Sequence, residues 1–201
     1  MTNLKANSKL HIFHAQTRLH ILKCETIHNF SVKFILAKDF FLIMHIEVVN
    51  AVKKDLERLI EVYSSPNLYH NREDATWFVK SFFDYHHVKV VRLDGNIVGA
   101  LFWRVNEERH HGIIVIEDFW IDEKFRRRGL GEKLLKTVIE DAKTFFEKSG
   151  YALRRVLVTT AETNIPARRL YEKIGFQKCA ELEDLFGQGE TELIYVLTLK
   201  P

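Results

Sequence analysis

A basic loop with two glycines is the stretch of this sequence best suited to chemistry. It reads Arg126-Arg127-Arg128-Gly129-Leu130-Gly131, between an apolar run from Ile113 to Ile121 and a long helical pattern. Glycine has no Cβ, so backbone N–H groups beside it can approach a ligand closely. The first turn of a helix adds unpaired N–H donors and the positive end of the helix dipole. The loop is therefore suited to hold a pyrophosphate, with arginines at its rim.

Two common phosphate-binding motifs do not fit this loop. A P-loop requires Gly-Lys-Ser/Thr before its helix, whereas Gly131 is followed by Glu132-Lys133-Leu134. The dinucleotide-binding fingerprint requires a third glycine where this chain has Leu134. The loop does match the pattern Gln/Arg-x-x-Gly-x-Gly/Ala in full. On the loop alone, a basic turn that merely connects a strand to a helix fits the sequence equally well.

The surrounding pattern predicts alternating strands and helices that position this loop. We expect strands at 45–49, 87–93, 97–105, 113–121, 155–160, 176–181 and 192–199, and helices at 53–63, 72–85, 130–148 and 164–174. Helix 130–148 has the clearest apolar periodicity. Asp94-Gly95 predicts a tight hairpin, and Pro166 suits the first turn of a helix. The order is β-α-α-β-β-β-α-β-α-β-β, an α/β sheet with helices on its faces.

The first 43 residues differ from the rest of the chain. They contain neither Gly nor Pro, and basic groups outnumber acidic ones six to two. We expect residues 1–43 to be an N-terminal extension and residues 44–201, from Met44 on, to be the working domain. A transit peptide, or an additional helix or strand packed on the core, is the alternative.

Composition restricts the class of protein. The chain has 201 residues and a formal net charge of +3. The part after residue 43 is nearly neutral, which argues against a dedicated nucleic-acid surface. No apolar run is long enough to span a bilayer, so we expect no membrane partner.

Cysteines and histidines give little sign of a redox or metal site. The two cysteines, Cys24 and Cys179, cannot form a disulfide framework and favour a cytoplasmic location. We expect Cys179 to be a small core residue rather than a nucleophile. The adjacent pair His86-His87 would point to opposite faces of a strand, so we expect no metal there.

A second motif accompanies the loop, Asn164-Ile165-Pro166-Ala167-Arg168-Arg169-Leu170-Tyr171-Glu172-Lys173-Ile174-Gly175-Phe176. It resembles the Asn-x-x-Ala-x-x-Leu-Tyr-x-x-x-Gly-Phe segment of the GNAT superfamily of acetyl-CoA-dependent N-acetyltransferases. The basic loop resembles the coenzyme loop of the same superfamily. With both motifs in the right order of strands and helices, residues 44–200 resemble this superfamily. The resemblance implies its fold, a mixed and mostly antiparallel sheet with helices on both faces.

The resemblance also implies acetyl-CoA as the acetyl donor, with no metal. Phe119, Trp120 and Ile121 would pair their backbone with the pantetheine arm, and the Asn164 side chain would contact the coenzyme. Arg126 holds the first position of the loop motif. The amides that would bind the pyrophosphate belong to Arg127, Arg128, Gly129, Leu130, Gly131 and Glu132.

Acetyl transfer needs a base for the amine proton and an acid for the departing thiolate. The resemblance implies Tyr171 as the acid, because a phenol pKa of about 10 is close to that of a thiol. We expect Glu117 as the base, acting through water from a strand face that it shares with Phe119 and Ile121. Glu162 is the alternative base. A salt bridge for Glu117, a core position for Tyr171 and a helix N-cap for Asn164 are the structural alternatives.

The expected function is therefore transfer of an acetyl group from acetyl-CoA to a primary amine by direct attack in a ternary complex. The acceptor is either a small molecule or a protein N-terminus or lysine. A CoA-binding or sensing module that lacks a competent base and acid is the alternative from another class. A homodimer is one assembly that the resemblance leaves open.

Overall fold

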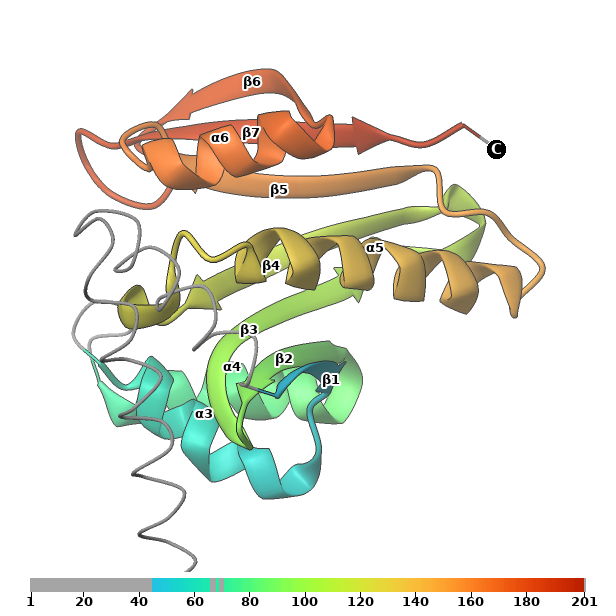
Figure 1. Ribbon diagram of the computed structural model, residues 1–201. Coiled ribbons are helices and arrows are strands. Elements are labelled where there is room, and N and C mark those ends of the chain that lie inside the picture. Colours follow the sequence, from blue (N-terminus) through green and yellow to red (C-terminus); the bar gives the residue numbers. More distant parts are fainter. Residues whose placement is uncertain (1–44, 66–67, 69–70, 201) are drawn as a thin grey trace, which may run out of the picture. The chain divides into compact units, whose positions relative to one another are not determined.

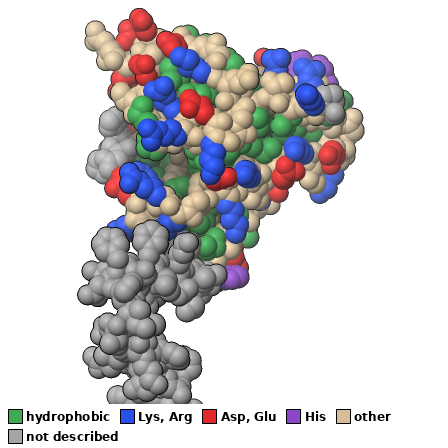
Figure 2. Space-filling model, turned by 45° about the horizontal axis from the view of Figure 1, so that its top comes forward, with side chains coloured by type: hydrophobic (Ala, Val, Ile, Leu, Met, Phe, Trp, Pro, Cys, Tyr) green, Lys and Arg blue, Asp and Glu red, His purple; other side chains and the backbone are tan. Residues whose placement is uncertain are grey.

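The computed structural model describes residues 45–65, 68 and 71–200. The predicted extension at 1–43 lies outside these residues. From Ile46 on, the chain forms one compact unit. None of the described helices is both long and apolar enough to cross a membrane. On the face seen in Figure 2, Lys and Arg side chains are interspersed with Asp and Glu.

The described residues form one seven-stranded sheet in the order β1-β2-β3-β4-β5-β7-β6 (Figure 1). All neighbouring pairs are antiparallel except β4 and β5, which are parallel. This confirms the predicted mixed, mostly antiparallel sheet. The strands are β1 (Ile46–Asn50), β2 (His87–Leu93), β3 (Asn96–Val105), β4 (Ile113–Ile121), β5 (Arg155–Ala161), β6 (Gln177–Glu183) and β7 (Thr191–Thr198).

Helices cover both faces of this sheet, as predicted. Phe102 of β3 packs against Tyr63 and Phe78, whereas the next residue, Trp103, contacts Phe145. Successive side chains of a strand point to opposite faces, so the helices that carry these partners lie on opposite sides. In Figure 1, α5 and α6 lie on one side of the sheet and α3 and α4 on the other. The α-helices of the described residues are α3 (Leu56–Tyr63), α4 (Arg72–Tyr85), α5 (Leu130–Glu147) and α6 (Ile165–Ile174).

Local sequence explains where several of these elements begin and end. The Asn71 side chain accepts a hydrogen bond from the Asp74 amide at 2.8 Å and caps α4. Asp94 and Gly95 both have positive φ, 47° and 83°, as the predicted hairpin turn between β2 and β3 requires. The sequence pattern did not predict the three short 3₁₀ segments, Lys53–Asp55, Arg109–His111 and Glu123–Phe125.

The prediction that Cys179 is a core residue is wrong. Cys179 is exposed, as is every other residue of β6. β6 is the last strand of the sheet. An edge strand has a neighbour on one side only, which leaves its side chains more open to solvent.

Candidate active site

The central feature of the site is the point where β4 and β5 separate. Their pairing runs only from Ile113 opposite Arg155 to Ile116 opposite Val158. Beyond it, β4 continues along β3 as far as Ile121, and β5 continues along β7 as far as Ala161. The two strands diverge in this region (Figure 1). Their facing backbone edges have no strand partner there, so an extended ligand can pair with one of them.

A β-bulge lies at this point of separation. Phe102 is opposite Asp118 and Trp103 is opposite Ile116, so Glu117 is the extra residue of β4. A bulge bends a strand and redirects its side chains. Here the Glu117 carboxylate accepts a hydrogen bond from Arg104 Nε at 2.5 Å.

The bulge changes the face on which Glu117 lies. Arg104 follows Trp103, which packs against α5, so Arg104 and Glu117 lie on the side of α3 and α4. Phe119 points the other way, since its ring lies within contact of Gly131 at the start of α5. The expectation that Glu117 shares a face with Phe119 and Ile121 is therefore wrong. Its assignment as the base stays a prediction.

The loop before α5 has the backbone geometry of an anion site. Arg127 and Gly129 both have left-handed φ values, 61° and 77°. Backbone of this kind recurs in anion-binding loops. The Lys133 amide is bonded to the Gly129 carbonyl at 3.0 Å, as expected one turn into α5. The amides of Leu130, Gly131 and Glu132 precede it, so they lack carbonyl partners within the helix.

Glycines at this junction leave space and allow close packing. A Cβ placed on Gly129 would meet nothing within 4 Å. A Cβ on Gly131 would lie 3.4 Å from both Phe119 Cζ and Leu170 Cδ2. Gly131 thus lets the start of α5 pack closely on β4 and α6, and the space beside Gly129 suits a ligand.

The charged side chains of the loop mostly hold the loop itself. Arg126 Nε donates to the Ile121 carbonyl at 3.0 Å, and the guanidinium of Arg128 lies 5.4 Å from the centre of the Phe125 ring. Glu132 accepts hydrogen bonds from Lys136 and Lys173, at 2.8 and 2.5 Å.

The two lysines lower the pKa of Glu132 to about 2. Lys173 belongs to α6, so its bond to Glu132 joins the two helices that border the site. These contacts fix the loop and leave its backbone amides to bind a ligand.

Asn164 and Tyr171 lie on α6, the helix that follows β5. Asn164 Oδ1 accepts a hydrogen bond from the Ala167 amide at 3.3 Å, which confirms the N-cap. Its contact with a coenzyme stays a prediction.

The Tyr171 ring is buried between Tyr195 and Phe176, with ring centres 5.8 and 5.6 Å away. Burial raises the pKa of Tyr171, and the negative charge of Asp118 raises it further. The phenol therefore stays protonated at neutral pH, as a proton donor must.

Asp118 is a residue of this site that sequence reasoning missed. Its Oδ1 accepts a hydrogen bond from Tyr63 Oη at 2.6 Å, and its side chain is only partly accessible. Loss of hydration raises the pKa of Asp118 to about 6, although the bond from Tyr63 acts in the opposite direction. The adjacent carboxylates of Glu117 and Asp118, just before the loop, were the signal in the sequence.

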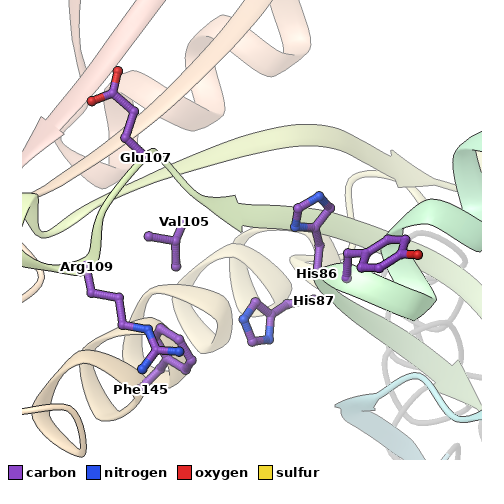
Figure 3. A pocket seen from close by; sticks show the side chains of 7 residues that line it. His86, His87, Val105, Glu107, Arg109 and Phe145 are labelled. Atoms are coloured by element: carbon purple, nitrogen blue, oxygen red, sulfur yellow. The ribbon is translucent and has the colours of Figure 1, made fainter.

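A separate pocket of about 410 Å³ lies where β2 begins and β3 ends (Figure 3). His87 stacks on Trp103 there, with ring centres 3.8 Å apart, and burial lowers the pKa of His86 and His87. No predicted site residue lines this pocket. Among the described residues, no group of three His, Cys, Asp or Glu side chains could hold a metal ion. The pocket is lined by Tyr85, His86, His87, Val105, Glu107, Arg109 and Phe145.

Proteins of known family resemble this chain in sequence, and others resemble it in fold. The chain is 28% identical over 146 residues to the spermine/spermidine N(1)-acetyltransferase of Bacillus subtilis, covering 70% of this chain and 93% of the relative. The L-amino acid N-acetyltransferase AaaT of Escherichia coli is 24% identical over 140 residues, covering 66% of this chain and 83% of the relative.

The crystal structure of a GNAT-family acetyltransferase from Streptococcus pneumoniae superposes with a TM-score of 0.63 at 21% identity. It covers 78% of this chain and 100% of that one. Residues 53–176 match the acetyltransferase (GNAT) family. The chain therefore belongs to the GNAT family and is an acyltransferase.

Proposed function

We propose that this protein transfers an acetyl group from acetyl-CoA to a primary amine. The separation of β4 from β5, immediately before a loop with unpartnered helix amides, is the observation that carries this proposal. The amides of Leu130, Gly131 and Glu132 would bind the pyrophosphate. The backbone from Phe119 to Ile121 would pair with the pantetheine arm, which leads the thioester toward Tyr171.

The reaction requires the chain to fill three catalytic roles. A carboxylate must accept the proton of the attacking amine, and Glu117 is the residue that the sequence predicts for this role. A backbone N–H near the end of β4 would stabilise the carbonyl oxyanion. The Tyr171 phenol would give its proton to the departing thiolate. Amine and thioester then react directly in a ternary complex.

The acceptor class that we propose is a small polyamine. The relative from Bacillus subtilis is named for spermine and spermidine. Three carboxylates face the α3–α4 side of the sheet: Glu117 and Asp118 at the point of separation, and Glu192 on β7, opposite Ala161 at the end of β5. Glu192 is nearly buried, and its pKa is raised by burial and by the charge of Glu190. Negative groups of this kind attract a chain of ammonium groups.

Glu192 can be placed on that side from its neighbours on β7. The Tyr195 hydroxyl donates to Glu172 of α6 at 2.9 Å, so Tyr195 and Leu193 face α6. Glu192 and Ile194 alternate with them and face the other way.

An acceptor screen tests the proposal. Purified protein is incubated with acetyl-CoA and with polyamines, amino acids, aminoglycosides or peptides, and free thiol release is followed. We expect the highest kcat/KM with spermine or spermidine, falling as salt screens the carboxylates. Tight acetyl-CoA binding without transfer to any amine would favour the sensing module. No acetyl-CoA binding in calorimetry would contradict the proposal altogether.

A further inference from the structure

Two consecutive carboxylates lie where β4 leaves β5, and their surroundings differ. Glu117 is exposed and paired with the Arg104 guanidinium. Asp118 is only partly accessible and accepts a hydrogen bond from the Tyr63 hydroxyl at 2.6 Å. Among the described residues, no ion pair includes Asp118. A carboxylate without a cationic partner keeps its affinity for a proton, whereas an ion-paired one is stabilised in its charged form.

The two carboxylates also act on different parts of the molecule. The charge of Asp118 reaches Tyr171, the predicted acid, from across the separated strands. The charges of Glu117 and Arg104 act instead on His86, at the end of α4. Asp118 is thus the β4 carboxylate that shares an electrostatic environment with the proposed proton donor.

We propose that Asp118, rather than Glu117, is the catalytic base of the acetyl transfer, and that Tyr63 is a positioning residue for its carboxylate. The assignment rests on the proposed function. The nitrogen of a neutral primary amine forms a bond to the carbonyl carbon of the acetyl thioester. The proton on that nitrogen passes to Asp118, the C–S bond breaks, and Tyr171 protonates the thiolate. The proton held by Asp118 then returns through water to the Tyr171 phenolate.

The groups around Asp118 leave its charge to be set by burial and by one hydrogen bond. Tyr63 donates its hydrogen bond to Asp118 from α3, and the raised pKa of Tyr171 on α6 keeps that phenol protonated at neutral pH. The residue opposite it on β3 is Phe102, which has no charge. The ion pair of Glu117 with Arg104 lies on the same face of the sheet. A pKa of about 6 leaves Asp118 ionised at neutral pH and more basic than an ordinary aspartate.

The test compares Asp118→Asn with Glu117→Gln, each nearly equal in shape to the native residue. The measured quantity is kcat/KM for the best amine of the screen across about pH 5 to 9. In the wild type, log kcat/KM should rise with a slope of about two below pH 6 and about one above it, because both the amine and Asp118 must lose a proton. Asp118→Asn should lower kcat about 10²-fold or more and give a slope of about one throughout. Glu117→Gln should keep the break in slope.

Tyr63→Phe provides a second readout, which also tests the assignment of Asp118 as the base if Asp118→Asn does not fold. It removes a hydrogen bond that favours the charged carboxylate and keeps the ring that packs on Phe78 and Phe102. The pKa of Asp118 should therefore rise, and the break in the slope of log kcat/KM should move to higher pH. Acetyl-CoA affinity and the thermal midpoint serve as folding controls. An active wild type with an unchanged pH profile in Asp118→Asn, or in Tyr63→Phe, would overturn this assignment alone. A wild type that acetylates no amine would overturn the proposed function and this assignment together.

Discussion

Burial raises the pKa of two acidic side chains of the candidate site, Asp118 and Tyr171. It disfavours the charged forms of Asp118 and Tyr171, so both hold their protons to higher pH than in water. The outcome at neutral pH differs between the two groups because the ordinary pKa of a carboxyl is far below that of a phenol. The pKa of Asp118 is brought toward neutral pH, where a carboxylate is most useful as a base, and Tyr171 stays protonated, as its proposed role as a donor requires.

Replacing Tyr171 with Phe tests the donor at the scale of one atom. Tyr171→Phe removes the hydroxyl but keeps the ring contacts with Tyr195 and Phe176. We expect kcat to fall about 10²-fold, because the thiolate then leaves without a proton. Acetyl-CoA affinity should stay unchanged, since the phenol is not among the groups proposed to bind the pyrophosphate. Steady-state kinetics and calorimetry measure the two quantities.

Tyr195→Phe is a matched control for this substitution. Tyr195 is equally buried, and its hydroxyl donates to Glu172 rather than facing the site. Its loss should cost about 1 kcal/mol of stability and leave kcat nearly unchanged. Equal kcat in the two variants would remove Tyr171 from the mechanism.

At the scale of elements, α5 connects the proposed coenzyme loop to the rest of the fold. Its apolar residues are buried against the sheet, which fixes the direction of its first turn. Two glycines with nearly equal φ flank it, Gly129 before and Gly150 after, with φ of 77° and 78°. A Cβ on either would meet nothing within 4 Å. Only the first lies at the proposed phosphate site.

This symmetry allows backbone strain to be separated from ligand binding. Gly129→Val and Gly150→Val should each lose about 1–2 kcal/mol of stability, because a branched residue resists positive φ. Only Gly129→Val should lose acetyl-CoA affinity, by about tenfold or more, since the branched side chain crowds the phosphate and misplaces amides that bind it. Thermal unfolding and calorimetry report the two effects. Equal affinity in both variants would exclude this loop as the coenzyme site.

At the scale of the whole molecule, the sequence predicted the elements better than their contacts. α4, β2 and β4 have the predicted bounds, because apolar periodicity and turn residues are local signals. The bulge at Glu117 could not be predicted, because it depends on the register with β3. The bond between Tyr63 and Asp118 joins residues 55 positions apart and likewise appears only in the folded chain. The loop motif indicated the proposed coenzyme site, but the strand pattern alone did not distinguish the two carboxylates.

Access from two sides of the sheet leads to a last prediction. The loop amides lie at the start of α5, on one side, whereas Glu117 and Asp118 face the side of α3 and α4. The proposed function therefore implies that acceptor and acetyl-CoA are bound together and react directly. We expect initial-rate lines at several acceptor concentrations to intersect in a double-reciprocal plot.

A double-displacement route would require an acetylated side chain of the protein. Cys179 is the free thiol of the described residues, but it lies on β6, three strands from β4 and roughly 14 Å across the sheet. Cys179→Ser should therefore keep its kcat, and mass spectrometry should find no acetylated protein when acetyl-CoA is supplied without an amine. Parallel lines, together with acetylation of Cys179, would contradict direct attack. They would show that the acetyl group passes through a covalent acetyl-protein intermediate, which direct attack does not form.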